Sequence, residues 1–146
     1  MRKVVASILA FALILSLCAC GSSPNRDTQT KYAYMLSFST HAMYYLFDTE
    51  TNTATTFTYY KDDKFVADVF TSEIDGELSG NSSVKLSFTD GIKPWTEKVV
   101  FDSKMSSIKV SIIDDPYSTD GTPYEVTYLT TDVKNVVSLL EKNGNK

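Results

Sequence analysis

Between residues 32 and 129 the chain repeats one pattern, a short run of β-forming residues followed by a turn signal. Turn residues interrupt runs rich in Thr, Tyr, Val, Phe and Ile every eight to twelve positions. Residues 84–88 and 107–113 alternate apolar side chains with Lys or Ser, which is typical of antiparallel strands with one buried face. The predicted runs are 32–38, 42–47, 54–60, 64–70, 73–78, 84–88, 96–101, 107–113 and 123–129.

The pattern changes to a helical period near the end of the chain. Four apolar residues recur on one helical face: Val133, Val136, Val137 and Leu140. Thr131 or Asp132 can cap the N-terminus, because a side-chain oxygen there accepts hydrogen bonds from free backbone amides. We therefore expect one helix over 131–143, packed on the sheet through its apolar stripe.

Together these elements predict a mainly β fold, an antiparallel meander or small barrel of about seven to nine strands with one C-terminal helix. The layout is similar to that of lipocalins, although their N-terminal Gly-x-Trp signature is missing and the single Trp is Trp95. A cystatin-like sheet is the alternative, but the helix of that family normally comes first. Bulky side chains are expected to point inward and fill a small barrel: Phe57, Tyr59, Phe65, Leu86, Phe88, Phe101, Ile108, Val110 and Ile112.

The N-terminal segment has the pattern of an exported protein. Arg2 and Lys3 precede an uncharged run over residues 4–17, which is shorter than the roughly 20 residues that a membrane-spanning helix needs. The next residues, Leu17-Cys18-Ala19-Cys20, resemble the lipobox of bacterial lipoproteins. That resemblance implies a diacylglyceryl thioether on Cys20 and cleavage just before it.

The resemblance divides the chain into a signal peptide (1–19), a lipid anchor with a flexible tether (20–31) and one β-rich domain with its helix (32–146). We expect the domain on the extracytoplasmic face of the cell membrane, held by the lipid. Loss of Arg2 and Lys3 changes the net charge from −4 to −6. This acidity argues against nucleic acid and favours neutral or cationic partners. The oligomeric state stays open.

Few residues point to catalysis or metal binding. The single histidine, His41, lies between two predicted strands, and the only cysteines are Cys18 and Cys20, so no multi-His or thiolate metal site is expected. Residues 114–121 are acidic and could hold Ca²⁺, although the same residue types are common in turns. We predict a non-catalytic protein without a cofactor. A carboxylate-dependent hydrolase is the weakest alternative, because most acidic residues fall at predicted turns or solvent-facing positions.

Aromatic residues are the most suggestive feature of the sequence. The adjacent pairs Tyr44-Tyr45 and Tyr59-Tyr60 must each point to opposite faces of a strand, so one member of each pair is expected outside the core. Outward tyrosines can stabilise a sheet across strands or form a binding surface. We predict that such a surface binds a protein or cell-envelope component, with a lipocalin-like small-ligand carrier as the alternative. The candidate residues are Tyr44, Tyr45, Tyr59, Tyr60, Trp95 on the predicted 90–94 turn, and Tyr117.

Overall fold

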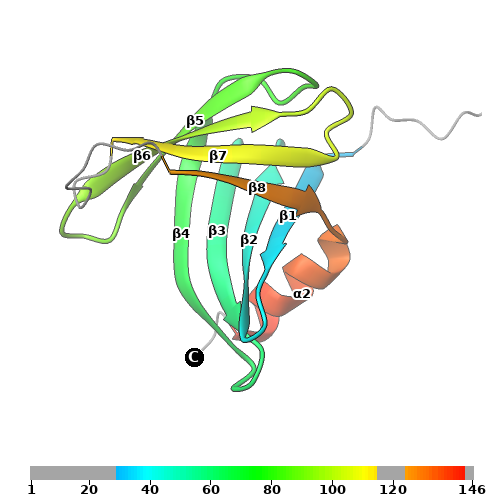
Figure 1. Cartoon of the computed structure of the whole chain (residues 1–146), viewed down its shortest axis with the longest axis vertical. Helices are drawn as coiled ribbons and strands as arrows, with labels where there is room; N and C mark the ends of the chain where they lie inside the picture. Colours follow the sequence, from blue (N-terminus) through cyan, green and yellow to red (C-terminus); the bar gives the residue numbers. More distant parts are fainter. Residues whose placement is uncertain (1–28, 115–123, 144–146) are drawn as a thin grey trace, which may run out of the picture.

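The structure is a computed structural model that describes residues 29–114 and 124–143. Eight antiparallel strands follow one another round a closed barrel, and β8 pairs with β1 to close it (Figure 1). The strands are β1 (Lys31–Ser37), β2 (His41–Asp48), β3 (Thr53–Tyr60), β4 (Phe65–Asp75), β5 (Ser83–Thr89), β6 (Pro94–Phe101), β7 (Ser107–Asp114) and β8 (Glu125–Thr130). Within the described residues one helix, α2 (Val133–Asn143), follows β8. The predicted antiparallel barrel with a C-terminal helix is confirmed, and the cystatin-like alternative is wrong.

The long strand β4 joins two of the predicted runs, 64–70 and 73–78. A β-bulge in the β3–β4 ladder adds one residue to β4, and Asp68 has a positive φ of 53° there. Such a bulge bends a strand and changes its alternation. As a result Phe70 packs against the interior cluster, whereas Val69 is exposed.

Apolar side chains form two clusters, one on each face of the first strands. The larger cluster fills the barrel interior and includes Tyr34, Tyr45, Phe47, Val84, Leu86, Phe88, Val99, Phe101, Ile108, Val110 and Tyr128. The second lies outside the barrel, where α2 packs against β1, β2 and β4 (Figure 1). Its buried members are Ala33, Ala42, Tyr44, Phe57 and Val136.

The predicted inward face of β3 is wrong. Phe57 and Tyr59 belong to the cluster beneath α2. Thr56 is paired directly with Tyr45, whose side chain lies in the interior, and directly paired residues share a face of the sheet. The helix thus gives β3 an apolar outer face, and alternation alone cannot distinguish it from the inner one. Phe65, also predicted inward, is exposed at the start of β4.

The two ends of the barrel differ in how the strands meet. β1 pairs with β8, and β4 with β5, over only two residue pairs each. These pairs lie toward the end formed by the connections 49–52, 76–82 and 102–106, which we call the closed end. Away from it, β8 leaves β1 and β5 leaves β4 (Figure 1). We call the other end, formed by residues 38–40, 61–64, 90–93 and the start of β8, the mouth.

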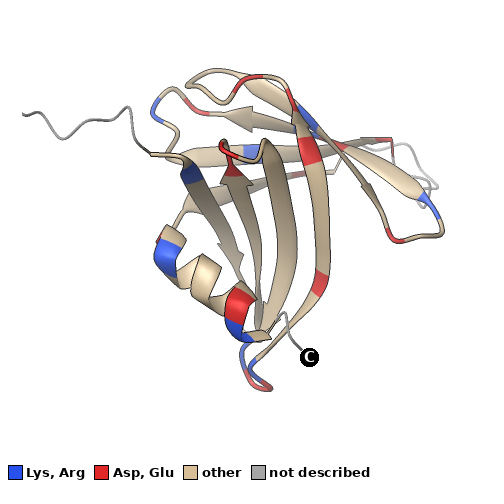
Figure 2. Ribbon diagram, turned by 180° about the vertical axis from the view of Figure 1, so that it is seen from behind, with Lys and Arg blue, Asp and Glu red and all other residues tan. Residues whose placement is uncertain are grey.

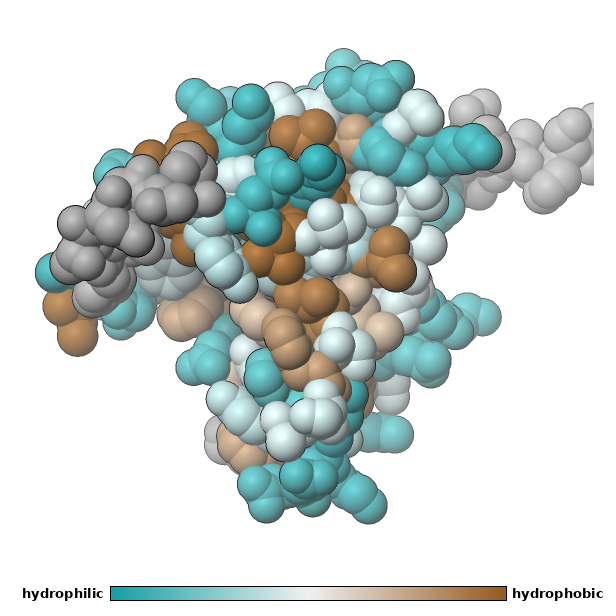
Figure 3. Space-filling model, in the orientation of Figure 1, coloured by the Kyte–Doolittle hydropathy of each residue, from teal (hydrophilic) through white to brown (hydrophobic). Residues whose placement is uncertain are grey.

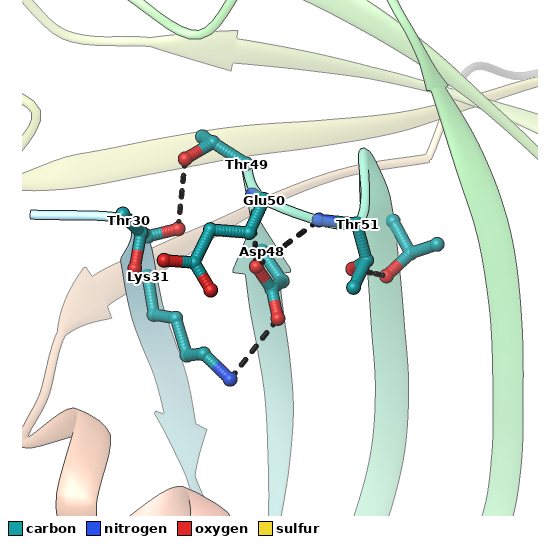
Figure 4. Close-up of polar contacts among 7 residues, drawn as sticks. Thr30, Lys31, Asp48, Thr49, Glu50 and Thr51 are labelled. Carbon is teal, nitrogen blue, oxygen red and sulfur yellow. Dashed lines mark hydrogen bonds and ion pairs between the residues drawn. The ribbon is translucent and has the colours of Figure 1, made fainter.

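The start of β1 is fixed to the β2–β3 connection at the closed end (Figure 4). Lys31 forms an ion pair with Asp48 at 3.0 Å. The backbone amide and the hydroxyl of Thr49 both donate to the carbonyl oxygen of Thr30, at 2.8 and 3.0 Å. The described chain therefore enters the barrel at the end opposite the mouth.

Asp132 caps the N-terminus of α2, because its carboxylate accepts a hydrogen bond from the Lys134 amide at 2.8 Å. The residues that pack on the barrel are Val133, Val136, Leu139 and Leu140, so Leu139 takes the place predicted for Val137. Among the described residues, no helix is long and apolar enough to cross a membrane. Acidic and basic residues are interspersed over α2, the hairpins and the outer strand faces (Figure 2).

Candidate functional site

A buried carboxylate lies on the inner face of β6, three residues from the mouth end of that strand. Glu97 continues the inward alternation of Val99 and Phe101, and it pairs with the interior residue Leu86 of β5. Only 7 % of its surface is exposed, and no other acidic residue of the described chain is buried. Buried carboxylates are uncommon because burial disfavours charge, so this residue marks the mouth as the candidate site.

Both carboxylate oxygens of Glu97 accept a hydrogen bond from an aromatic side chain. The Tyr45 hydroxyl, from β2 across the barrel, donates to Oε2 at 2.5 Å. The indole N–H of Trp95 donates to Oε1 at 3.0 Å. No ion pair joins Glu97 to a basic residue of the described part of the chain. The carboxylate is therefore held in place by neutral donors, without a countercharge.

Burial controls the protonation of this group. It raises the pKa of Glu97 above its usual value, and the hydrogen bonds from Tyr45 and Trp95 oppose the rise only in part. Burial also raises the pKa values of Tyr45 and Tyr128, and the nearby charge of Glu97 raises them further. Both tyrosines therefore remain neutral hydrogen-bonding groups, while the carboxyl is the group whose charge can change.

A cavity of about 80 Å³ adjoins Glu97 in the mouth. Its lining residues are Met43, Tyr45, Glu97, Val110, Ile112, Tyr124, Val126 and Tyr128. Tyr124 is 65 % exposed, so the cavity reaches the surface at that residue. Since a water occupies about 30 Å³ of liquid, the space suits two or three waters or the end of a larger molecule. On the face of the molecule drawn in Figure 3, apolar residues form an irregular band down the middle and polar residues flank it.

A larger hollow, of about 720 Å³, lies at the closed end. Its lining residues are Gln29, Tyr32, Gly80, Ser103, Lys104 and Met105. Most of these side chains are polar and exposed, and Tyr32 is the one aromatic group among the described residues that line it. Because it holds no buried polar group that could orient a ligand, we place the candidate site in the mouth instead.

The first tyrosine pair is buried on both faces of β2. Tyr44 lies beneath α2 with its ring stacked on Phe57 at a centroid distance of 5.0 Å, and it is 9 % exposed. Tyr45 points into the barrel and is 2 % exposed. The expectation that one member of this pair lies outside the core is wrong, because the helix covers the outer face of the strand.

The other predicted aromatic residues are spread over the molecule. Tyr59 packs against the cluster beneath α2, and Tyr60 stacks on Phe65 at 4.8 Å. Trp95 lies in β6 rather than on a turn, half-buried and edge-to-face with Phe70 at 5.0 Å. Tyr117 lies outside the described residues. Of the predicted set, Tyr45 and Trp95 are brought together, and Glu97 joins them.

The remaining candidate site residues from the sequence lie away from the mouth cavity or outside the described residues. His41 is the first residue of β2 rather than a loop residue, and its ring stacks on Phe38 at 4.6 Å. Apart from Asp114, the proposed Ca²⁺ segment 114–121 lies outside the described residues. Within residues 29–114 and 124–143, no three His, Cys, Asp or Glu side chains are grouped so as to hold a metal ion.

The described part of the chain is thus an eight-stranded antiparallel barrel with an outer helix and a buried carboxylate in its mouth. Comparisons with protein-family models, with curated proteins and with solved structures found no match. The function is therefore inferred from the sequence pattern and from the geometry of the mouth.

Proposed function

We propose that the chain is a lipid-anchored bacterial lipoprotein on the extracytoplasmic face of the cell membrane, and that it binds a ligand or envelope component without catalysis. The observation that carries the binding role is the cavity beside Glu97, which combines apolar walls with a few oriented polar groups. Binding sites commonly have this composition. The proposed occupant is the end of a molecule that reaches in from the surface.

The size of the cavity favours partial insertion over enclosure of a whole ligand. At the closed end Tyr34, Phe47 and Phe101 are almost fully buried and occupy the interior. The mouth cavity of about 80 Å³ is well below the roughly 300–1,000 Å³ of pockets that enclose a drug-sized ligand. We therefore favour a protein that binds one chemical group of its partner. A lipocalin-like carrier, which would enclose a whole ligand, is less favoured.

The proposed anchor rests on the sequence between Arg2 and Cys20, which has the order of a lipoprotein signal. Two acyl chains on one residue anchor a protein stably, whereas one chain binds weakly. The described chain enters the barrel at the closed end, where Lys31 is bound to Asp48. A tether attached there leaves the mouth at the other end for a partner.

Cell fractionation tests the anchor. Cys20→Ala should leave the membrane fraction or accumulate with its signal peptide attached, because the lipidated sulfur is gone. Cys18→Ala is the matched control and should remain lipidated in the membrane. If Cys20→Ala behaves like the parent protein while Cys18→Ala is released, the assignment of the anchor to Cys20 is wrong.

The fluorescence of Trp95 tests the binding site, because it is the single tryptophan of the chain and contacts Glu97. The full-length protein in phosphatidylcholine vesicles is titrated with n-butanol and with n-butylammonium, and at least one should give a saturable change. Val126→Phe should fill the cavity and abolish that change. Val69→Phe, at an exposed position outside the cavity lining, is the matched control and should not. Equal responses from both variants, or none from the parent protein, would overturn the proposed site.

A further inference from the structure

We propose that the mouth selects a ligand with a positively charged amine on a short apolar stem, and that the ionised carboxylate of Glu97 binds this amine. This inference rests on the proposed binding function of the same cavity. It assigns the chemical class of the occupant, a primary ammonium group with a few carbon atoms behind it.

Charge complementarity is the first argument. A buried carboxylate is normally paired with a basic group or a metal ion, because an isolated charge in an apolar environment is strongly unfavourable. Glu97 has neither among the described residues, and no basic side chain lines the cavity. A cationic ligand would supply the missing countercharge, whereas an anionic ligand would be repelled.

The free acceptor positions are the second argument. A carboxylate offers about four lone-pair positions, and the hydrogen bonds from Tyr45 and Trp95 use one on each oxygen of Glu97. The Tyr128 hydroxyl donates to the weak acceptor Sδ of Met43, at 4.0 Å, and also interacts with the Tyr45 hydroxyl. Because a hydroxyl oxygen has two lone pairs, the Tyr128 oxygen can accept a further hydrogen bond. An ammonium group has three donors and no acceptor, which matches this set of acceptors.

The walls of the cavity fit the stem of such a ligand. Val110, Ile112 and Val126 line the space beside the carboxylate and offer apolar contact. Met43 adds an unbranched side chain that adapts to irregular shapes. Tyr124, exposed at the rim, marks where the rest of the ligand would leave the cavity.

The pH dependence of binding follows from the groups that face Glu97. These are Tyr45 on β2, Trp95 on β6, and Tyr124 and Tyr128 on β8, while β7 contributes the apolar Val110 and Ile112. Burial raises the pKa of Glu97, so the free protein keeps this proton to a higher pH than an exposed Glu does. Because the amine binds the ionised form, binding releases this proton. Affinity should therefore increase as pH rises through the pKa of Glu97 and then level off, while the amine stays charged up to about pH 10.

The experiment compares three probes of equal length on the full-length protein in phosphatidylcholine vesicles, followed by Trp95 fluorescence: n-butylammonium, n-butanol and butyrate. We expect n-butylammonium to bind at least about tenfold more tightly than n-butanol at pH 8, and butyrate not to bind. Glu97→Gln should reduce n-butylammonium affinity to that of n-butanol and remove its pH dependence. Because the substitution could disturb folding, its thermal unfolding is measured, and the pH series on the parent protein provides a test that needs no variant.

The outcomes separate this inference from the proposed function. Saturable binding of n-butanol with equal or tighter affinity than n-butylammonium would leave the binding site standing and overturn the cationic ligand. An n-butylammonium affinity that does not rise between pH 5 and pH 8 would also overturn it. Failure of both probes to bind would overturn the binding site itself, and the inference with it.

Discussion

The closed end and the mouth of the barrel use similar aromatic residues in different ways. At the closed end the rings of Tyr34, Phe47 and Phe101 contact one another edge-to-face, with centroid distances of 5.3 to 6.0 Å. The Tyr34 hydroxyl donates to the carbonyl oxygen of Met105 at 3.1 Å. The connections also approach closely, since a Cβ atom on Gly80 would collide with the carbonyl oxygen of Ser103. These rings therefore pack against one another, and the Tyr34 hydroxyl bonds to the backbone.

At the mouth the aromatic groups contact one another and also hold a carboxylate. Tyr45 contacts Tyr128 edge-to-face at 4.9 Å, but its hydroxyl is directed to Glu97. Trp95 packs on Phe70 and donates to the same carboxylate. Aromatic content alone therefore does not identify a binding surface. The polar group that the rings hold, and the space left beside it, distinguish a candidate site from a core.

The backbone explains why space remains at the mouth. The two short ladders that close the barrel lie toward the closed end, and both irregular registers lie toward the mouth, in the β3–β4 and β6–β7 pairs. Bulges increase local twist and bend strands away from regular pairing. Val69 and Ile113, next to these irregularities, are exposed. At the mouth, therefore, fewer strand pairs close the barrel and the side chains do not fill the interior.

The largest expected difference between the two ends is in the stability that their apolar residues provide. Phe101→Ala at the closed end should reduce the free energy of unfolding by about 3–5 kcal/mol, because it leaves a cavity in a tightly packed ring cluster. Ile112→Ala at the mouth should cost about 1–2 kcal/mol, because that side chain is half-buried beside an existing cavity. Urea denaturation measures both. Equal losses would show that the closed end is not the more tightly packed.

The next difference concerns the two buried tyrosine hydroxyls. Tyr45→Phe removes a donor from the buried carboxylate and should cost about 1–3 kcal/mol at pH 8. Tyr34→Phe removes one hydrogen bond to a carbonyl oxygen and should cost about 0.5–1.5 kcal/mol. Chemical denaturation of the two variants gives the comparison. A smaller loss for Tyr45→Phe than for Tyr34→Phe would argue against a charged Glu97 in the folded protein at that pH.

Strand and helix existence could be read from the sequence, because alternation and turn residues act locally. The sequence does not reveal which face of β3 points into the barrel, because α2 covers the outer face, where Phe57 and Tyr59 lie. This cover is a tertiary contact between residues about 80 positions apart in the chain. It also explains why Tyr44, one of the candidate surface residues, is buried.

The key residue of the candidate site, Glu97, has a signal in the sequence. Glu97 occupies the same parity in β6 as Trp95, Val99 and Phe101, so alternation alone places it inside. Charged residues are usually exposed, however, and this general rule favours a solvent-facing position for Glu97. The cross-barrel hydrogen bond to Tyr45 could not be predicted, because it depends on closure of the barrel between strands far apart in sequence.

A third prediction concerns the pH dependence of stability and tests whether the Glu97 carboxyl changes its charge. Burial raises the pKa of Glu97 in the folded state, so its stability contribution is fully present below the pKa of an unfolded Glu and is lost as pH rises through the folded value. Stability of the parent protein relative to Glu97→Gln should therefore fall between pH 4.5 and pH 8. Urea denaturation of both proteins across this range measures the difference. A constant difference would show that Glu97 does not titrate in this range.

The smallest expected effect lies in the surface ion pairs. At the closed end the Lys31–Asp48 pair has side chains that are 39 % and 16 % exposed, whereas those of the Lys109–Glu125 pair on β7 and β8 are 58 % and 53 % exposed. Exposed pairs contribute about 0–1 kcal/mol, and salt screens them. Lys31→Gln should therefore reduce stability by under about 1 kcal/mol at low salt, and Lys109→Gln by less still.

The stability contribution of the Lys31–Asp48 pair should also depend on pH. The more exposed Lys109–Glu125 pair serves as the comparison. Burial acts to raise the pKa of Asp48. Hydrogen bonds from Lys31 and from the amides of Glu50 and Thr51 outweigh this effect and hold the pKa below its usual value. A carboxyl with a depressed pKa stabilises the fold above its unfolded pKa, and this contribution is lost as pH falls through the folded value. The difference between the parent protein and Lys31→Gln should thus shrink on acidification and in about 1 M NaCl, where screening is nearly complete. If Lys109→Gln proves the more destabilising of the two in urea denaturation at pH 7, then the contacts at the start of β1 do not reinforce the closed end.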